Sequence, residues 1–173
     1  RPSATLTLNA GTLTSSLVEI EPGGTLEGCG TLHADVVNHG TLRVACPGGL
    51  TVNGALENHG LVIVTHGSQL VLQGAVDNAG TLDLIGSPLT TLPAQFTNTG
   101  TVLDATHVRI QSASRTGDAL TVVIRTHPGH TYELQTSTLE GGWTAVTANV
   151  SAVTTPDGVK TYTVTGLGTG AAF

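Results

Sequence analysis

Short apolar runs recur every 20 residues along residues 41–104 of the chain. Within each run, such as TLRV at residues 41–44, apolar and polar residues alternate, which is typical of a β-strand with one buried face. An Asn-x-Gly motif precedes each run, and Gly-rich corners such as CPGG and THGS separate the runs. No helical period interrupts this order, so the pattern predicts about three short strands in every unit of 20 residues.

Residues that stand 20 positions apart form columns of one chemical character. Three apolar columns consist of Leu42, Val62, Leu82 and Val102, of Leu32, Val52, Leu72 and Leu92, and of Val36, Leu56, Val76 and Phe96. A further column, Ala34, Gly54, Gly74 and Ala94, contains only small residues. One unit cannot bury its apolar side alone, whereas stacked copies bury it against one another. The columns therefore predict an all-β fold that begins with a right-handed parallel β-helix of 20-residue coils.

The Asn residues of the repeated motif form a column of their own. We expect their side-chain amides to hydrogen-bond from coil to coil as a structural ladder of Asn38, Asn58, Asn78 and Asn98. The Gly two positions after each Asn is expected to provide a positive φ for a tight corner. The column of small residues indicates a place where the backbones of successive coils approach closely.

The regular spacing is lost at both ends of the chain. Residues 11–32 use similar motifs at a different spacing, which predicts irregular starting coils. From Leu120 onward the alternating runs are longer and are separated by turns such as THPGH and TPDG, which predicts a small antiparallel β-sandwich. We therefore expect a parallel β-helix over residues 1–110, a linker over 111–118 and a β-sandwich over 119–173.

The charge of the chain argues against two classes of partner. The formal net charge is −6, with six Lys and Arg residues, whereas nucleic acids and anionic membranes attract basic surfaces. No apolar run approaches the roughly 20 residues of a membrane span, so we expect no membrane insertion. The chain begins at Arg1 rather than Met, which indicates a processed form or an excised piece.

The two cysteines, Cys29 and Cys46, leave two alternatives open. In a secreted protein they can form a disulfide, and otherwise they are two buried free thiols. A zinc site is not expected, because no CxxC spacing accompanies them.

Several pairs of polar residues are candidates for a catalytic or metal-binding site. Glu57 and Asp77 share a column, which places them about 5 Å apart on adjacent coils, near the carboxylate separation of a retaining glycosidase. No aromatic platform accompanies this pair, so we expect solvated carboxylates. His39 and His59 stack in the same way, but Ala79 continues their column and the metal ligands end at two.

His127 and His130 flank a Pro-Gly turn, and surface residues are again the favoured interpretation. The sequence thus predicts no catalytic residue, no metal and no cofactor.

The two ends of the chain suggest self-association. The run ATLTLN at residues 4–9 is a clean alternating strand without a polar cap, and bare solenoid ends associate. The C-terminal sandwich, which ends at Phe173, is expected to lack part of its last strand. We expect subunits to join head to tail, and heterologous contacts of that kind propagate into filaments. The expected subunit contacts are Ala4, Thr5, Leu6, Thr7, Leu8, Asn9 and Phe173.

The C-terminal part of the chain carries a family resemblance. The run YELQTS at residues 132–137, followed by Leu139 and Trp143, resembles a C-terminal β-sandwich module of large secreted bacterial repeat proteins. The preceding Asn-x-Gly-Thr-Leu repeats resemble autotransporter-type β-helix repeats. The closing strand of that module typically continues as Phe-Tyr-Arg, whereas this chain stops at Phe173. The resemblance implies an extracellular or cell-surface location and a structural or adhesive use, without catalysis.

We therefore expect a secreted, non-catalytic structural protein that forms a homo-oligomeric filament or surface array. The alternative is an adhesin or carbohydrate-binding module with a surface polysaccharide as partner, and a polysaccharide-active enzyme is less favoured. Sugar binding favours exposed aromatic side chains, and the coils supply almost none. Only Tyr132, Trp143 and Tyr162 could serve, and Trp143 is expected in the core of the sandwich.

Overall fold

The computed structural model describes residues 3–87, 90–127, 130–137, 143–146, 150–154 and 158–166. The chain divides into two compact units, Arg1–His107 and Val108–Phe173. We call the first unit the solenoid and the second the C-terminal unit, and each is described by itself.

The solenoid consists of eleven strands that form one continuous sheet, in which every strand pair is parallel. A short 3-10 helix, η1 (Ala105–His107), follows the last strand. The strands are β1 (Thr5–Ile20), β2 (Thr25–Asn38), β3 (Thr41–Val44), β4 (Leu50–Val52), β5 (Leu56–Asn58), β6 (Leu61–Val64), β7 (Leu70–Leu72), β8 (Val76–Asn78), β9 (Thr81–Asp83), β10 (Phe96–Asn98) and β11 (Thr101–Leu103).

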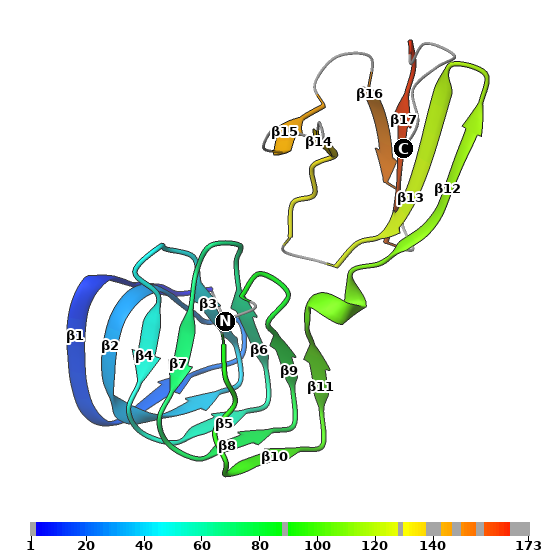
Figure 1. Ribbon diagram of the computed structural model, residues 1–173. Coiled ribbons are helices and arrows are strands. Elements are labelled where there is room, and N and C mark those ends of the chain that lie inside the picture. The colour runs from blue at the N-terminus through cyan, green and yellow to red at the C-terminus, as the bar shows by residue number, and fades with distance from the viewer. Residues whose placement is uncertain are drawn as a thin grey trace. The chain divides into compact units, whose positions relative to one another are not determined.

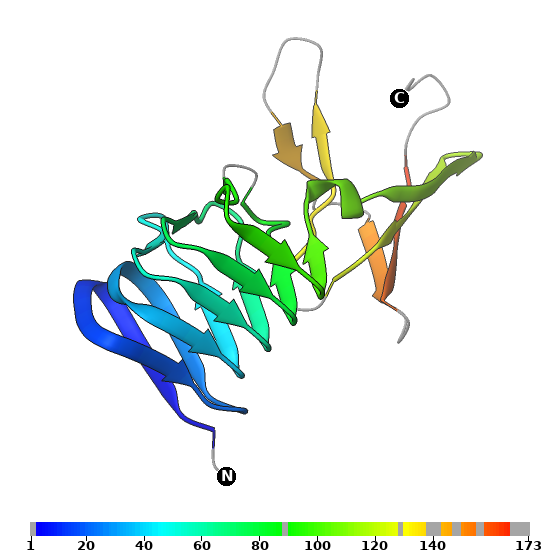
Figure 2. The same cartoon turned by 90° about the horizontal axis from the view of Figure 1, so that it is seen from below.

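Successive coils lie on top of one another, as Figures 1 and 2 show. Leu61 pairs with Thr81 and Leu56 pairs with Val76, so each residue lies against the one 20 positions later. This register confirms the all-β fold and the 20-residue parallel coils that the columns predicted. Three strands make up each of the coils 41–60 and 61–80.

The apolar columns form the interior of the solenoid. Leu42, Val62 and Leu82 are each 0% exposed, and they are direct neighbours in the parallel register. The same column continues to Leu6 through Leu26 in one direction and to Val102 in the other. Because each coil buries its apolar side against the next, the hydrophobic effect stabilises the stack rather than any single coil.

The first two coils are irregular, as the altered spacing predicted. Thr5 pairs with Thr25 at a separation of 20 residues, whereas Thr25 pairs with Thr41 at a separation of only 16. The difference arises at one corner, where Cys29 alone connects Gly28 to Gly30. In the next coil, Val44 and Leu50 are the register partners of these two glycines. Five residues, 45–49, connect them across the same corner.

The glycines of the Asn-x-Gly motif have a different role from the one expected. None of Gly40, Gly60, Gly80 and Gly100 has a positive φ, so the expectation of left-handed corners at these positions was wrong. A Cβ atom on Gly60 would instead lie 2.2 Å from the carbonyl oxygen of Gly40. Gly74, in the column of small residues, faces the carbonyl of Gly54 in the same way, at 2.3 Å. The glycines of both columns therefore leave no room for a side chain, because adjacent backbones nearly touch there.

The C-terminal unit is antiparallel, in agreement with the sequence. A four-stranded sheet has the order β12-β13-β17-β16, and β14 pairs with β15 in a separate two-stranded sheet. Val122, Tyr162 and Val164 are its buried side chains among the described residues. The strands are β12 (Ile110–Thr116), β13 (Ala119–Arg125), β14 (Gln135–Ser137), β15 (Trp143–Ala145), β16 (Val150–Thr154) and β17 (Val159–Val164).

The region between the units differs from the expected linker. Residues 111–118 form most of β12 and the turn that joins it to β13. Gly117 has a φ of 62° in that turn, which favours glycine there. The compact units meet in the sequence at His107 and Val108, a few residues before the expected boundary.

Candidate functional site

The open edge of β1 is the first candidate site. β1 is 16 residues long and pairs in parallel with β2 along its length. On its other side no strand of the described chain pairs with it. We call this side the open edge. Its backbone N–H and C=O groups are available to another strand, which is why such edges are association sites unless they are blocked.

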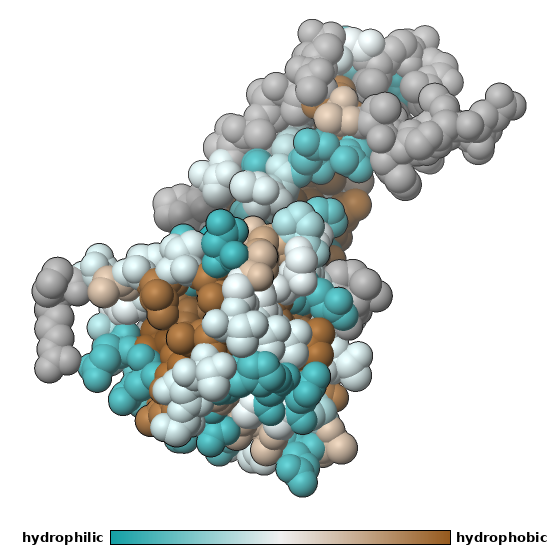
Figure 3. Space-filling model, turned by 90° about the vertical axis from the view of Figure 1, so that its left-hand side faces the viewer, coloured by the Kyte–Doolittle hydropathy of each residue, from teal (hydrophilic) through white to brown (hydrophobic). Residues whose placement is uncertain are grey.

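Apolar side chains surround the open edge. Leu6 and Leu17 are 53% and 48% exposed, and Leu8, Leu13 and Val18 are half-buried against the core. An apolar depression of about 270 Å³ lies at this end, lined among others by Leu6, Val18, Ile20 and Leu26. Figure 3 shows hydrophobic surface gathered on this end of the solenoid. The interior of the stack is therefore partly uncovered at β1.

The expected contact residues at the N-terminus lie at this end. Thr5, Leu6, Thr7, Leu8 and Asn9 belong to β1, and the carbonyl of Ala4 accepts a hydrogen bond from the N–H of Thr25 at 2.8 Å. Phe173, the seventh expected contact, lies outside the described residues.

The four Asn residues of the motif form a ladder of side-chain hydrogen bonds. Nδ2 of Asn38, Asn58 and Asn78 donates to Oδ1 of the next Asn at 2.7, 2.6 and 2.7 Å. Each of these nitrogens also donates to the backbone carbonyl 23 positions later, as Asn58 does to Thr81 at 3.1 Å. The first three Asn side chains are 0% exposed, so the ladder satisfies amides that burial would otherwise make costly. Asn98 is exposed and ends the ladder.

The outward face of the coils brings together the carboxylates and imidazoles that the columns predicted as neighbours. Glu57 and Asp77 are paired in register beside a shallow depression of about 640 Å³. Glu57 Oε1 lies 2.7 Å from Nε2 of His59. The rings of His39 and His59 stack with centroids 4.9 Å apart and planes inclined by 9°. The described residues contain no group of three or more metal-ligating side chains.

The two histidines of the C-terminal unit lie beside an open depression of about 500 Å³. Thr126, Tyr132 and Lys160 also line it. The hydroxyl of Tyr132 accepts a hydrogen bond from the backbone N–H of His127 at 2.9 Å, and the Lys160 ammonium lies 4.8 Å from the centre of the Tyr162 ring. Tyr162 and Lys160 both donate to the backbone carbonyl of Tyr132. These contacts anchor the Tyr132 segment to β17.

The two cysteines meet at the irregular corner. Both are half-buried free thiols, and they occupy the same corner of adjacent coils. Burial raises the pKa of Cys46 to about 11, and the neighbouring Cys29 raises it as well. At neutral pH Cys46 is therefore protonated.

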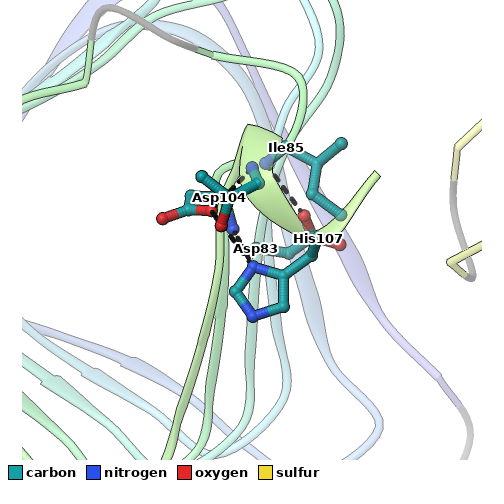
Figure 4. A network of polar contacts seen from close by, with 5 residues as sticks. Asp83, Ile85, Asp104 and His107 are labelled. Carbon is teal, nitrogen blue, oxygen red and sulfur yellow. Dashed lines mark hydrogen bonds and ion pairs between the residues drawn. The ribbon is translucent and has the colours of Figure 1, made fainter. Parts of the chain in front are cut away.

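A polar network around η1 was not predicted from the sequence (Figure 4). The Asp104 carboxylate accepts hydrogen bonds from the backbone N–H and the hydroxyl of Thr106, at 2.8 and 2.6 Å, and it lies 3.1 Å from His107 Nδ1. These contacts, led by the Thr106 hydroxyl, lower the pKa of Asp104. Asp83 lies in the preceding coil and is 2% exposed. Its carboxylate accepts a hydrogen bond from the backbone N–H of Ile85 at 3.1 Å. The sequence does contain a signal for this network: Asp104 interrupts an apolar column, and Asp is a preferred residue at the N-terminal cap of a helix.

No helix in the described part of the chain is long and apolar enough to cross a membrane. No family model matches the chain, and no curated protein and no solved structure matches it at a significant level.

Proposed function

We propose that this chain is a non-catalytic structural protein that acts outside the cell and associates head to tail through the open edge of β1. The observation that carries the proposal is the 16-residue strand whose outer edge has no strand partner in the described chain. The proposal includes kinship with autotransporter-type β-helix repeat proteins, which is supported by the Asn-x-Gly repeats.

The composition of β1 favours association. Proteins commonly block an exposed edge with Lys, Pro or inward-pointing charges. β1 contains neither Lys nor Pro, and Glu19 is its one charged residue. Register shifts interrupt β1 at Asn9/Gly11 and at Thr14/Leu17, and such irregularities protect an edge, so the regular stretch from Thr5 to Asn9 is the part that favours the addition of a parallel strand.

The other end of the solenoid offers a matching surface. β10 and β11 are the outermost strands of the sheet, and no described strand pairs with their far edges. Leu6 belongs to the same column as Val102, and Val18 belongs to the same column as Phe96. A second copy whose Leu6 and Val18 continued these two columns would extend the apolar interior in register. For this reason a copy of the same chain is the favoured occupant of the open edge.

Substitution of Leu6 tests the proposal. We expect the wild-type chain to form assemblies whose average mass, measured by light scattering, rises with concentration, and negative-stain microscopy to show filaments. Leu6→Lys places a charge at the edge and should leave a monomer with an unchanged circular dichroism spectrum. Gln73→Lys introduces the same charge at an exposed position that belongs neither to β1 nor to the terminal strands β10 and β11, and it should assemble like the wild type. A wild-type chain that remains monomeric at all accessible concentrations would contradict the proposal.

One observation favours a second candidate function, an adhesin or carbohydrate-binding module. The depression beside Glu57 and Asp77 has a volume of about 640 Å³ and also includes Gln95, so it offers polar groups to a polysaccharide, whereas the Phe96 ring at its wall packs against the core. A glycan array probed with the monomeric Leu6→Lys variant tests this alternative. Binding that is lost in Glu57→Gln and Asp77→Asn would support it, and no binding would leave the structural function as the better account.

A further inference from the structure

The corner at Cys29 places two thiols on successive coils. Cys29 is the single residue between Gly28 and Gly30, whose φ values are 126° and 128°. Their register partners in the next coil are Val44 and Leu50, and Cys46 lies in the loop between these two. The two cysteines thus occupy the same corner of adjacent coils.

The backbone holds both cysteines in place. The N–H of Gly30 donates to the carbonyl of Gly49 at 3.0 Å, which ties the Cys29 corner to the next coil. The N–H of Gly49 donates to the carbonyl of Cys46, also at 3.0 Å, which closes a turn in the loop. Adjacent parallel strands lie about 4.8 Å apart, and a disulfide usually requires Cα atoms roughly 4.4–6.8 Å apart. Cys29 and Cys46 occupy the same corner of two such neighbouring coils, and Cys29 is close enough to raise the pKa of Cys46, so we expect a bond between them to need little movement of the backbone.

We propose that Cys29 and Cys46 are a redox site and form an intramolecular disulfide between adjacent coils in an oxidising environment. Residues 29–46 follow one complete turn of the solenoid, so this bond closes a single coil into a covalent ring. The ring contains β3 and most of β2, the strand on which β1 lies.

The chemistry is thiol–disulfide exchange with a small-molecule disulfide such as oxidised glutathione. One cysteine thiolate attacks the oxidant and forms a mixed disulfide, which releases one glutathione thiolate. The second cysteine then attacks the protein sulfur and releases the other glutathione. The two cysteines lose two electrons and two protons in total, and one oxidised glutathione becomes two reduced molecules.

The environment of Cys46 sets the pH dependence of this reaction. Only a thiolate attacks a disulfide, and the pKa of Cys46 is raised to about 11 by burial and by Cys29. Ring closure should therefore be slow at neutral pH and faster as the pH rises. Once it has formed, the disulfide lowers the conformational entropy of the unfolded chain, and it thereby stabilises the folded state.

Peptide mapping of the full chain tests the proposal directly. The protein is incubated with oxidised glutathione at mildly alkaline pH, denatured without reductant, alkylated and digested with trypsin. Arg43 lies between the two cysteines, so cleavage there opens the ring and leaves two peptides joined by the disulfide. We expect an intact mass about 2 Da lower than that of the reduced protein, no alkylation before reduction and two alkylated cysteines after it.

Serine variants supply the controls. Cys29→Ser and Cys46→Ser should each leave one alkylatable thiol and no linked peptide. Reduction should lower the thermal unfolding midpoint of the oxidised wild-type chain by about 5–10 °C, and it should not change that of the double Ser variant. Two freely alkylated thiols after prolonged oxidation, or linked peptides that occur only in covalent dimers, would overturn the proposal.

Discussion

The side-chain nitrogen of Asn58 donates a hydrogen bond to Oδ1 of Asn78 at 2.6 Å, and both side chains are 0% exposed. Asn58 also accepts from Asn38 at 2.7 Å and donates to the carbonyl of Thr81 at 3.1 Å. Each interior amide of the ladder is thus held from both sides. An amide ladder inside an apolar stack fixes the register, because a slip by one residue would leave buried polar groups without partners.

Asn58→Ala should destabilise the solenoid by about 2–4 kcal/mol, because it removes three hydrogen bonds and leaves one N–H of Asn38 and the Oδ1 atom of Asn78 without a partner. Urea-induced unfolding measured by circular dichroism checks this value. Gln73→Ala, an exposed amide in the next coil, is the matched control and should change the stability by less than about 0.5 kcal/mol. Equal losses of unfolding free energy in the two variants would show that the Asn ladder makes no specific contribution to stability.

Gly80→Ala should also destabilise the solenoid, by about 2–3 kcal/mol, because its Cβ atom would lie 2.2 Å from the carbonyl oxygen of Gly60. The coils would have to separate locally to accept the methyl group. The control is Gly48→Ala, since a Cβ on Gly48 meets nothing within 4 Å and its φ is not positive. Thermal unfolding of the two variants should therefore differ, and a wild-type midpoint for Gly80→Ala would contradict the close approach of the backbones.

The carboxyl of Asp104 should titrate below its ordinary range, because the Thr106 hydroxyl, the Thr106 N–H and His107 all favour the carboxylate. Thr106→Val removes the hydroxyl donor and should raise the pKa of Asp104 in a carbon-detected NMR titration. Thr97→Val, an exposed Thr on β10, should leave that pKa unchanged. A folded-state pKa below the unfolded value means that Asp104 stabilises the fold above the unfolded pKa. This contribution is lost as the pH falls through the folded pKa. An ordinary pKa in the wild-type chain would contradict the network.

The interior of the solenoid could be predicted because identical environments repeat along its axis. Leu42, Val62 and Leu82 occupy equivalent positions, so one spacing identified the whole column. The Asn ladder follows from the same spacing, since its members contact only their equivalents in adjacent coils.

The features that were not predicted depend on local backbone geometry, which cannot be inferred from the spacing of residues in the sequence. The motif predicts a positive φ for the glycine after each Asn, whereas the short distance between the backbones of adjacent coils is what requires glycine there. The 16-residue second coil arises at the Gly28–Gly30 corner, where two positive φ values replace a five-residue loop. The pairing of residues 111–116 with β13 likewise depends on contacts made across the sheet, and Ala113 is the one apolar residue in this stretch, so no apolar alternation marks it as a strand.

Register partners in successive coils are 20 residues apart, and this distance also limits the insertions and deletions that such a protein can accept. Removal of residues 61–80 would join Gly60 to Thr81 and bring Leu42 beneath Leu82, with every column still aligned. A duplication of the same segment would lengthen the rod without disturbing its neighbours, whereas an insertion of one residue inside a strand would turn its apolar side chains to the solvent. Insertions and deletions are thus tolerated in whole-coil steps, and unequal recombination between neighbouring repeats supplies steps of that size.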